Sequence, residues 1–320
     1  MQQFRRATYA ETTKRTYSSM KTAYLRFCLY FSRTPVPADR MTVLLYRVFL
    51  TRSLSATSIP GYMNIIRLLH LEVGLPNPLE TWEQKALHKG ILRLKGTPTK
   101  QKLPITPDIL RRMHSHMDMS EPFLVAFWAA CIIAFFCFLR KSTMLPETRG
   151  SGSRKQTYLS LHDAKISPDK DSAMITVRHT KTIQFGQRVL KLPLARVPDS
   201  VLCPVKALEH LLSQYSEELQ HSNAPLFSYV DRSGVLKSLT YKSFVKTLKY
   251  YLDKCGYDSG AYSGHSFRRG GCSYAFDIGI PPLLIKLRGD WRSNAYERYV
   301  TVYDAMHEKL AQSLSAGIVN

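Results

Sequence analysis

The feature that most constrains the fold of this chain is an uninterrupted apolar run from Phe123 to Leu139, FLVAFWAACIIAFFCFL. A helix that is apolar on every side is either buried in a large core or crosses a membrane. This run is at the short end of what spans a bilayer, stands alone in the sequence, and is followed directly by Arg140 and Lys141. Pro122 suits the first turn of a helix. We therefore expect a fully buried core helix and no membrane span.

The charge balance points to a polyanionic partner. Lys and Arg number 45 against 24 Asp and Glu, which gives a formal net charge of +21. A monomer this cationic repels itself unless it binds a polyanion, and nucleic acid is the commonest one. A membrane surface, or a basic cytosolic protein without such a partner, is the alternative. The apolar fraction of 44% and the charged fraction of 22% are typical of soluble globular proteins and exclude wholesale disorder.

The six cysteines indicate neither a zinc knuckle nor a disulfide framework, because no two are spaced as C-x-x-C. We expect Cys131 and Cys137, inside the apolar run, to be buried thiols, and a reducing compartment fits this usage best. The N-terminus, MQQFRR, has no apolar stretch after its basic pair, so no secretory signal is predicted. Acidic residues are not clustered in a way that would hold Mg²⁺, and we predict no metal and no other cofactor.

Helical periodicity dominates the first part of the chain. Between residues 12 and 31 apolar residues recur at intervals of three and four, which predicts an amphipathic helix. Further helical stretches are expected over residues 43–52, from Gly61 to a stop at Gly74, and over residues 82–94. All four carry Lys or Arg on their polar faces. We interpret residues 1–95 as a small all-helical domain.

Residues 96–104, GTPTKQKLP, are predicted to be a linker, because prolines, a glycine and lysines offer little to bury. A basic strap between two domains can follow the DNA backbone, although solvation alone would also explain these charges. The candidate DNA-binding residues here are Lys95, Lys100 and Lys102.

The second domain, residues 105–320, combines helices with a small β-structure. The runs Ala173–Val177 and Arg188–Leu192 alternate in polarity and are separated by a turn that includes Gly186, which predicts an antiparallel hairpin. The fold class is therefore mainly α with a small antiparallel β-sheet. The helices of this domain are expected at residues 107–116, along the apolar run to 140, and at 204–219, 241–254, 265–278, 281–288 and 291 onward.

Two cationic residues, Arg140 and Lys181, are expected at positions where they could bind a phosphate. Arg140 is expected at the end of the buried helix, where a guanidinium needs an anion and its planar fork suits phosphate oxygens. Lys181 lies in the predicted turn of the hairpin, from which an ammonium can reach a DNA groove or a leaving oxygen. Taken singly, each is also explained as a helix cap or an exposed lysine.

The segment GHSFRRGG, residues 264–271, carries a stronger signal. Ser263 can cap the helix that follows, and His265 and Arg268 then share one helical face. Histidine and arginine together near a helix start make a natural phosphate or oxyanion site. A capped surface helix would not need both.

A tryptophan and three tyrosines follow in GDWRSNAYERYVTVY, residues 289–303. A phenol is a poor nucleophile at neutral pH unless neighbouring cations stabilise its oxyanion. Aromatic residues at this spacing are, in isolation, more often core packing. The candidates are Trp291, Tyr296, Tyr299 and Tyr303.

Taken in order, an arginine, a hairpin lysine, His-x-x-Arg, a tryptophan and a tyrosine resemble the catalytic signature of the tyrosine recombinase/integrase family. The helical N-terminal part and basic linker resemble that family's core-binding domain, so the resemblance spans roughly residues 10–310. GHSFRRGG with GDWRSNAYERY is most similar to recombinases of eukaryotic mobile elements of the DIRS and Crypton kind. The resemblance implies a SAM-like core-binding domain over 1–95, a linker over 96–104 and an α+β catalytic domain over 105–320.

The resemblance implies a site-specific recombinase that cuts and rejoins DNA through a 3′-phosphotyrosyl intermediate, without metal or ATP. Arg140 and Arg268 would clamp the non-bridging oxygens of the scissile phosphate, and Lys181 would protonate the departing 5′ oxygen. His265 would assist proton transfer at the nucleophile, and Trp291 would hydrogen-bond or pack the phosphate.

Tyr299 would attack the phosphorus, with Tyr296 as the reserve nucleophile and Tyr303 as a packing residue. Two departures from the family pattern stand out. Thr143 occupies a position where the family often has an acidic residue, which would leave Arg140 less firmly oriented. The spacing from tryptophan to tyrosine is also about one residue shorter than in phage members.

Two other functions share this scaffold: a catalytically inactive, domesticated DNA-binding protein, and a type IB topoisomerase that relaxes DNA without site preference. The implied partners are double-stranded DNA and further copies of the chain, a dimer per site and a tetramer in synapsis, with no membrane. The tail, residues 304–320, has an apolar helical stripe that would dock on a neighbouring protomer or on its own domain. The eukaryotic resemblance implies a nuclear location, and otherwise a cytoplasmic one.

Overall fold

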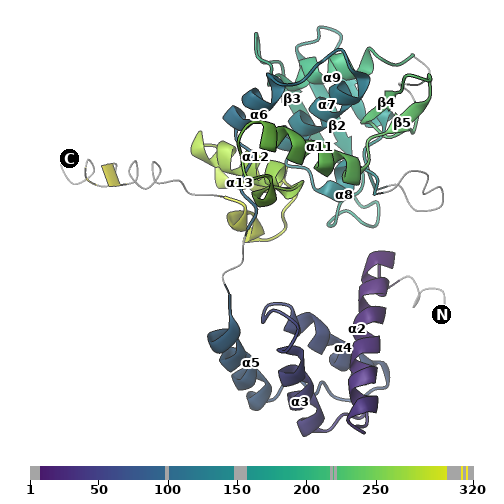
Figure 1. The fold of residues 1–320 in the computed structure, drawn as a ribbon, viewed down its shortest axis with the longest axis vertical. Coiled ribbons are helices and arrows are strands. Elements are labelled where there is room, and N and C mark those ends of the chain that lie inside the picture. Colours follow the sequence, from purple (N-terminus) through teal and green to yellow (C-terminus); the bar gives the residue numbers. More distant parts are fainter. Residues whose placement is uncertain are drawn as a thin grey trace. The chain divides into compact units, whose positions relative to one another are not determined.

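The computed structural model describes residues 8–97, 101–147, 157–216, 219, 222–300, 311–312 and 315. The chain divides into two compact units, residues 1–100 and 101–320. This division falls inside the segment 96–104 that the sequence predicts to be a linker. The described regular structure of the first unit is helical, and the second unit is a larger mixed α and β body (Figure 1). The predicted fold class, mainly α with small antiparallel sheets, is confirmed.

The first unit is helical throughout its regular structure, and its helices begin close to the predicted positions. Polar side chains fix two starts: Asp39 accepts from the backbone N–H of Thr42, and Thr81 from that of Gln84. The interior holds an aromatic cluster in which the rings of Tyr24 and Tyr46 lie 5.0 Å apart. The helices are α2 (Glu11–Tyr30), α3 (Arg40–Leu50), α4 (Ile59–Glu72) and α5 (Trp82–Lys95).

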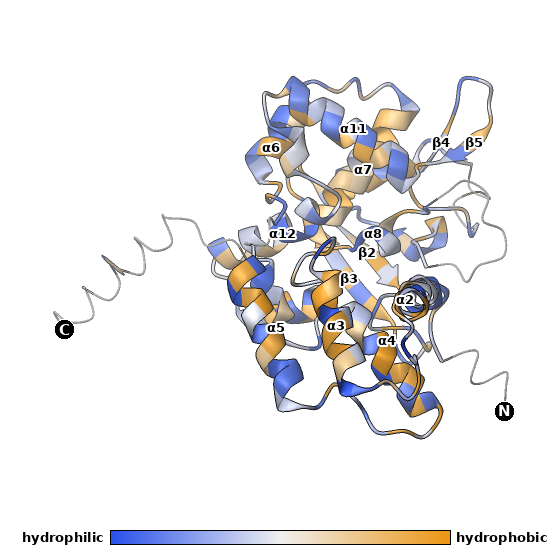
Figure 2. Cartoon of the chain, turned by 60° about the horizontal axis from the view of Figure 1, so that its bottom comes forward, coloured by the Kyte–Doolittle hydropathy of each residue, from blue (hydrophilic) through white to orange (hydrophobic). Residues whose placement is uncertain are grey.

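The second unit is built around α7 (Pro122–Phe136), in which every residue from Val125 to Phe135 is buried. Helix α7 is apolar along its length (Figure 2) and packs against α9, α12 and β4. The expectation of a core helix, with buried Cys131 and Cys137, is confirmed. Among the described residues, no helix combines the length and apolarity needed to cross a membrane.

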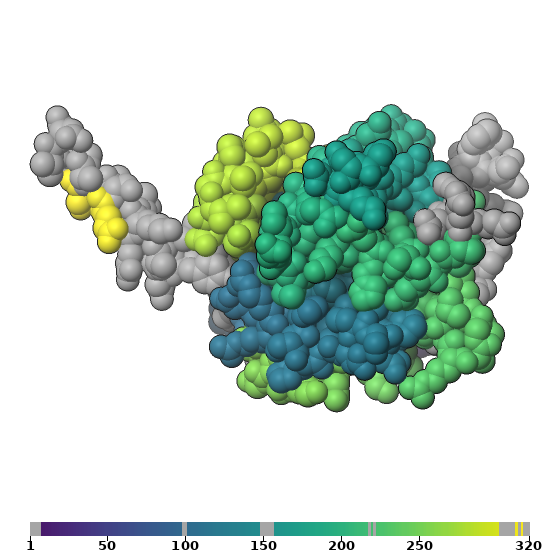
Figure 3. All heavy atoms as spheres, turned by 90° about the horizontal axis from the view of Figure 1, so that it is seen from above, coloured from purple at the N-terminus to yellow at the C-terminus, as the bar shows by residue number. Residues whose placement is uncertain are grey.

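The other helices of this unit cover α7 and the sheets. Figure 3 shows the unit as one body, in which the blue α6 region lies against segments from much later in the chain. Three 3₁₀ turns, η1 (Leu161–Asp163), η2 (Ser259–Ala261) and η3 (Asn294–Arg298), join longer elements. The α-helices are α6 (Pro107–His114), α8 (Lys141–Met144), α9 (Pro204–Leu212), α11 (Tyr241–Lys254), α12 (His265–Asp277) and α13 (Pro282–Arg288).

The predicted hairpin is present as β2 (Ser172–Val177) and β3 (Leu190–Ala195), paired antiparallel with Val177 opposite Leu190. β1 (Ala164–Ile166) adds a third antiparallel strand, and β4 (Ser228–Val230) pairs with β5 (Leu236–Ser238). The sequence did not predict these three strands, because each has only three residues and shows too little alternation to recognise.

Three predicted helix boundaries are wrong. Helix α7 ends at Phe136, and the chain turns at Phe138, whose φ is +49°, before Arg140 precedes the short helix α8. The apolar run continues through this turn because the turn itself is buried, so hydrophobicity does not mark the helix end. Helix α9 ends at Leu212, well before residue 219. From Trp291 to Val300 the chain forms the 3₁₀ turn η3 in place of the predicted α-helix, whereas Ala311, Gln312 and Ser315 are helical and the other residues of the tail lie outside the described residues.

Candidate active site

Helix α12 positions the His-x-x-Arg pair. Ser263 accepts a hydrogen bond from the backbone N–H of His265 at 3.3 Å, which fixes the turn before the helix, but the N-cap is Gly264 and no side chain caps the helix, so the predicted cap by Ser263 is wrong. Two glycines follow because other chain segments press on this helix. A Cβ at Gly270 would overlap the carbonyl oxygen of Ile105, and one at Gly271 would overlap that of Phe135. Gly271 therefore lets α12 pack against α7, and Gly270 lets it pack against the backbone at Ile105.

Arg268 is held deep in the unit, with 2% of its area exposed. Its guanidinium donates to the carbonyl oxygens of Phe138 and, at 2.6 Å, of Gly289. Its Nε–H has no hydrogen-bond partner in the described structure. Burial, and next the charge of Arg140, lower the pKa of Arg268 to about 9, so the group is cationic at neutral pH. A buried cation with a spare donor is suited to an anion such as a phosphate.

Arg140 lies beside this group, after the turn that ends α7. Burial lowers its pKa, while the charge of Asp290 and then that of Tyr299 oppose this shift. Arg140 and Arg268 line the same small cavity, together with Thr180 and Asp290. The two arginines thus lie at one cavity although 127 residues separate them along the chain. Two guanidinium groups at one cavity create a strong local positive potential.

Tyr299 stands next to Arg268. The guanidinium carbon of Arg268 lies 5.3 Å from the centre of the Tyr299 ring, and the phenol also acts on Arg268 through a hydrogen bond. Ser273 on α12 donates to the backbone oxygen of Tyr299 at 3.1 Å, which anchors the segment. Tyr296 packs against Trp291 with ring centres 6.2 Å apart. The described tyrosine contact with Arg268 thus falls on Tyr299, while Tyr303 lies outside the described residues.

Trp291 forms the wall between these groups. Its ring lies 3.8 Å from the guanidinium carbon of Arg268 and 5.3 Å from the ring of Tyr299. A Cβ at Gly289 would overlap the Trp291 ring, so the glycine of Gly-Asp-Trp makes room for the indole. The Trp291 side chain therefore orients both the cation and the phenol.

His265 stands at the first position of α12 and keeps contact with solvent. Desolvation lowers its pKa, and the charges of Lys141, Arg268 and Arg140 lower it further. The imidazole is therefore neutral at neutral pH. A neutral imidazole can accept a proton, as a general base must.

Lys181 lies in the loop between β2 and β3 and is exposed. Its neighbours Thr180 and Thr182 both donate hydrogen bonds to the carboxylate of Asp290. Arg292 donates to the backbone oxygen of Thr182 at 2.8 Å. The residues on either side of Trp291 thus hold the loop that carries Lys181. No role for Asp290 was predicted from the sequence, although an acidic residue within a basic segment was a visible signal.

Two of the three candidate DNA-binding lysines lie within the described residues, one in each unit. Lys95, at the end of α5, donates to the backbone oxygen of Thr51 at 3.2 Å. Lys102 donates to the backbone oxygen of Gly260 at 2.5 Å, so it belongs to the second unit. Lys100 lies outside the described residues.

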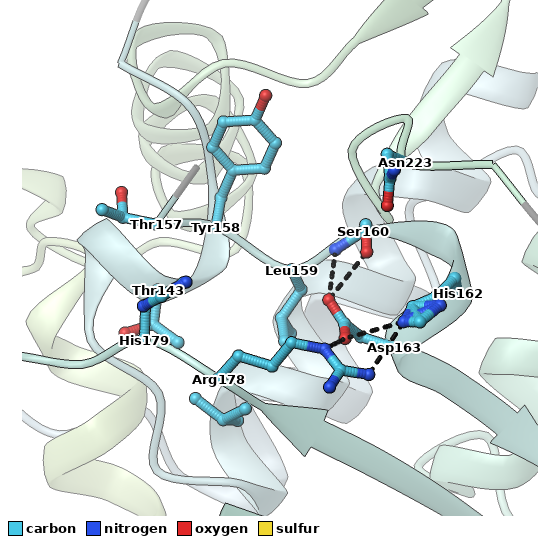
Figure 4. Close-up of a pocket in the computed structure, with 11 residues that line it drawn as sticks. Thr143, Thr157, Tyr158, Leu159, Ser160, His162, Asp163, Arg178, His179 and Asn223 are labelled. Atoms are coloured by element: carbon cyan, nitrogen blue, oxygen red, sulfur yellow. Dashed lines mark hydrogen bonds and ion pairs between the residues drawn. The ribbon is translucent and has the colours of Figure 1, made fainter. Parts of the chain in front are cut away.

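A second pocket opens beside the hairpin (Figure 4) and contains an internally paired charge network. The buried carboxylate of Asp163 accepts from the backbone and hydroxyl of Ser160 and, at 2.9 Å, from Arg178. Arg178 also contacts His162 at 2.8 Å. Because Asp163 neutralises Arg178, this network holds the start of the hairpin loop and leaves the anion site to Arg140 and Arg268.

Comparison with known proteins gives one relative in sequence and several in structure. No family model matches the sequence. The integrase/recombinase xerD homolog of Selenomonas ruminantium is 24% identical over 282 residues, which are 86% of this chain and 77% of the relative.

Two solved structures share the fold. The Tn1549 transposon integrase, in complex with transposon right end DNA, has a TM-score of 0.61 at 12% identity and covers 98% of this chain and 97% of its own. The XerH site-specific recombinase, bound to a palindromic difH substrate in a post-cleavage complex, has a TM-score of 0.53 at 12% identity. That match covers 91% of this chain and 75% of the XerH chain. Both similarities extend over most of the two units.

Proposed function

Since this chain belongs to the tyrosine recombinase/integrase family, we propose that it is a site-specific DNA recombinase that cuts and rejoins strands through a 3′-phosphotyrosyl intermediate. The observation that carries this proposal is the placement of the Tyr299 ring against Trp291 and beside Arg268, which lines one cavity with Arg140. The DNA complexes of the two structural neighbours support DNA as the partner.

The chemistry follows from the charges at the site. The phenol oxygen of Tyr299 attacks the phosphorus and the bond to the 5′ oxygen breaks, leaving a 3′-phosphotyrosyl link and a free 5′ hydroxyl. Negative charge gathers on the non-bridging oxygens, where the guanidinium groups of Arg140 and Arg268 stabilise it. His265 accepts the phenol proton, and Lys181 gives a proton to the departing oxygen. The link retains the bond energy, so rejoining needs neither ATP nor a metal.

The remaining cations have roles in binding. Lys95, Lys100 and Lys102 contact the DNA backbone, where each neutralised phosphate adds affinity that depends on salt. Two copies bind each site and four form the synapse. The similarity to DIRS and Crypton recombinases, and the nuclear location that it implies, remain predictions.

The test is a nicked suicide substrate, on which the covalent adduct accumulates because the cleaved strand diffuses away. Candidate sites come from selection of bound duplexes from a random library. Tyr299→Phe should abolish the adduct and leave DNA binding intact, while Tyr296→Phe serves as the matched control and keeps the adduct. An adduct that disappears only with Tyr296→Phe contradicts the assignment of the nucleophile.

Two other outcomes would favour different functions. Tight, salt-sensitive binding without an adduct from any tyrosine would indicate an inactive DNA-binding protein, the function that Thr143 brings into question. Relaxation of a supercoiled plasmid that lacks any selected site would indicate topoisomerase activity.

A further inference from the structure

Asp290 joins the two segments that carry Lys181 and Trp291. Its side chain is only 3% exposed. One carboxylate oxygen accepts from Thr180, at 2.7 Å, and from Thr182, and the other accepts from Arg188. The carboxylate therefore binds both ends of the loop between β2 and β3, from Thr180 on one side to Arg188 on the other.

The backbone conformation of Asp290 indicates that its carboxylate side chain has a function at this position. Its φ of +54° lies in the left-handed region, where glycine fits best and aspartate and asparagine are the best tolerated alternatives. A glycine would relieve the backbone but would remove all three side-chain contacts. An outlier of this kind, held by surrounding contacts, is typical of functional sites.

Asp290 also lies close to the arginine pair. It lines the same cavity as Arg140 and Arg268, and its negative charge acts on Arg140. Thr143, where a carboxylate is common in the family, is buried and uncharged. Asp290 is thus an acidic group that serves Arg140 from a different part of the chain.

We propose that Asp290 is a positioning residue that clamps the β2–β3 loop so that Lys181 faces the leaving oxygen, and that it provides Arg140 with the carboxylate that Thr143 lacks. This inference rests on the proposed recombinase function. Asp290 acts through Lys181 and Arg140 and does not itself touch the reacting atoms.

The first part of the inference has a chemical signature. When the P–O5′ bond breaks, the 5′ oxygen takes a proton from Lys181, because an alkoxide is a poor leaving group. A sulfur in place of that oxygen leaves as a thiolate, whose conjugate acid has a pKa of about 8.5, and it needs no proton. Variants that disturb only protonation of the leaving group should therefore regain their cleavage rate on a substrate with a bridging sulfur.

The experiment measures single-turnover adduct formation on matched suicide substrates with a bridging 5′ oxygen or sulfur. The variants are Asp290→Asn, which tolerates the left-handed backbone, Asp290→Gly, which fits it, and Thr182→Val, which removes one tether of the loop. Lys181→Ala and Arg268→Lys are the references for loss of the proton donor and loss of the phosphate clamp. Asp277→Asn, an exposed carboxylate at the end of α12, is the matched control. Melting temperature and DNA binding are measured for every variant.

On the oxygen substrate, both Asp290 variants should slow cleavage by on the order of 10²-fold, the lower end of the range for general acid catalysis. On the sulfur substrate, most of that loss should disappear for Lys181→Ala and Thr182→Val. It should disappear in part for the Asp290 variants, which also leave Arg140 without its carboxylate, and should persist for Arg268→Lys.

The outcomes separate this inference from the proposed function. Equal losses on both substrates for the Asp290 variants, or no loss on either, would overturn the positioning role while the unchanged protein still forms its adduct. No adduct from the unchanged protein on either substrate would overturn the proposed function and this inference with it.

Discussion

The guanidinium of Arg268 lies over the indole of Trp291, with its carbon 3.8 Å from the ring centre. This contact joins helix α12 to the segment that carries Trp291 and Tyr299. A cation over a desolvated indole gains about 2 kcal/mol. The same guanidinium donates to two backbone oxygens from other segments, so the arginine is fixed on several sides. Arg268 is therefore oriented before any phosphate arrives.

Replacing Trp291 tests this orientation. Trp291→Ala should lower the stability of the fold by about 3–5 kcal/mol, the usual cost of emptying a buried aromatic site. Trp291→Phe keeps part of the wall and should lose less stability but still slow adduct formation, since phenylalanine binds a cation more weakly than tryptophan. Urea unfolding and suicide-substrate cleavage measure the two effects. If Trp291→Phe matched the unchanged protein in rate, the indole would not orient the site.

Alanine substitutions at Gly289 and at Gly90 should change the stability of the fold in opposite directions. At Gly289 the new methyl group would overlap the Trp291 ring, so Gly289→Ala should destabilise the protein by about 1–3 kcal/mol and slow cleavage. Gly90 lies within α5 with open space around its Cβ position, so Gly90→Ala should stabilise the first unit by about 0.5–1 kcal/mol. Thermal unfolding followed by circular dichroism compares the two variants. A loss of stability at Gly90 would contradict the account.

The pH dependence of cleavage should show the state of His265. Its folded pKa lies below the ordinary value of 6.5, because partial desolvation and three neighbouring cations disfavour the imidazolium. The neutral base thus predominates above pH 6.5, and the rate should fall as the pH drops through the lowered pKa. Over the same window the unfolded chain binds more protons than the folded one, so stability should also fall with acidification.

Single-turnover rates at saturating protein, from pH 5 to 8, measure this profile. His265→Gln should lower the rate and flatten the acid limb. An acid limb that survives unchanged in His265→Gln would assign it to another group.

Two adjacent arginines offer a matched comparison. Arg268→Ala should abolish the adduct, and it should also destabilise the fold, because two carbonyl oxygens lose a buried donor at about 1–3 kcal/mol each. Arg269 donates to Gln101 and to the backbone oxygen of Lys102 at the protein surface. Arg269→Ala should therefore keep the adduct and change stability little. Adduct gels and denaturant titrations of both variants test this. Equal loss of adduct in both variants would contradict the assignment of Arg268 to the phosphate site.

The course of the chain across the second unit was largely predictable. The apolar run had to become a buried helix, because its side chains have no polar face to turn to water. Helix α11 (Tyr241–Lys254) has the predicted bounds, since its periodicity is strong and Thr240 caps its first turn. The end of α7 was not predictable, because the buried turn at Phe138 is as apolar as the helix before it.

The residues that could form a phosphate site can be recognised from the chain alone: arginines, a histidine, a lysine and a tyrosine, in an order typical of one family. How these residues meet becomes visible in the folded molecule. The choice of Tyr299 over Tyr296 depends on which ring approaches Arg268, and the role of Asp290 depends on a loop more than a hundred residues earlier in the chain. Such contacts join segments that are distant in the chain, and they form only where burial and hydrogen bonding bring the segments together. Local sequence patterns describe neighbours along the chain and carry no direct record of them.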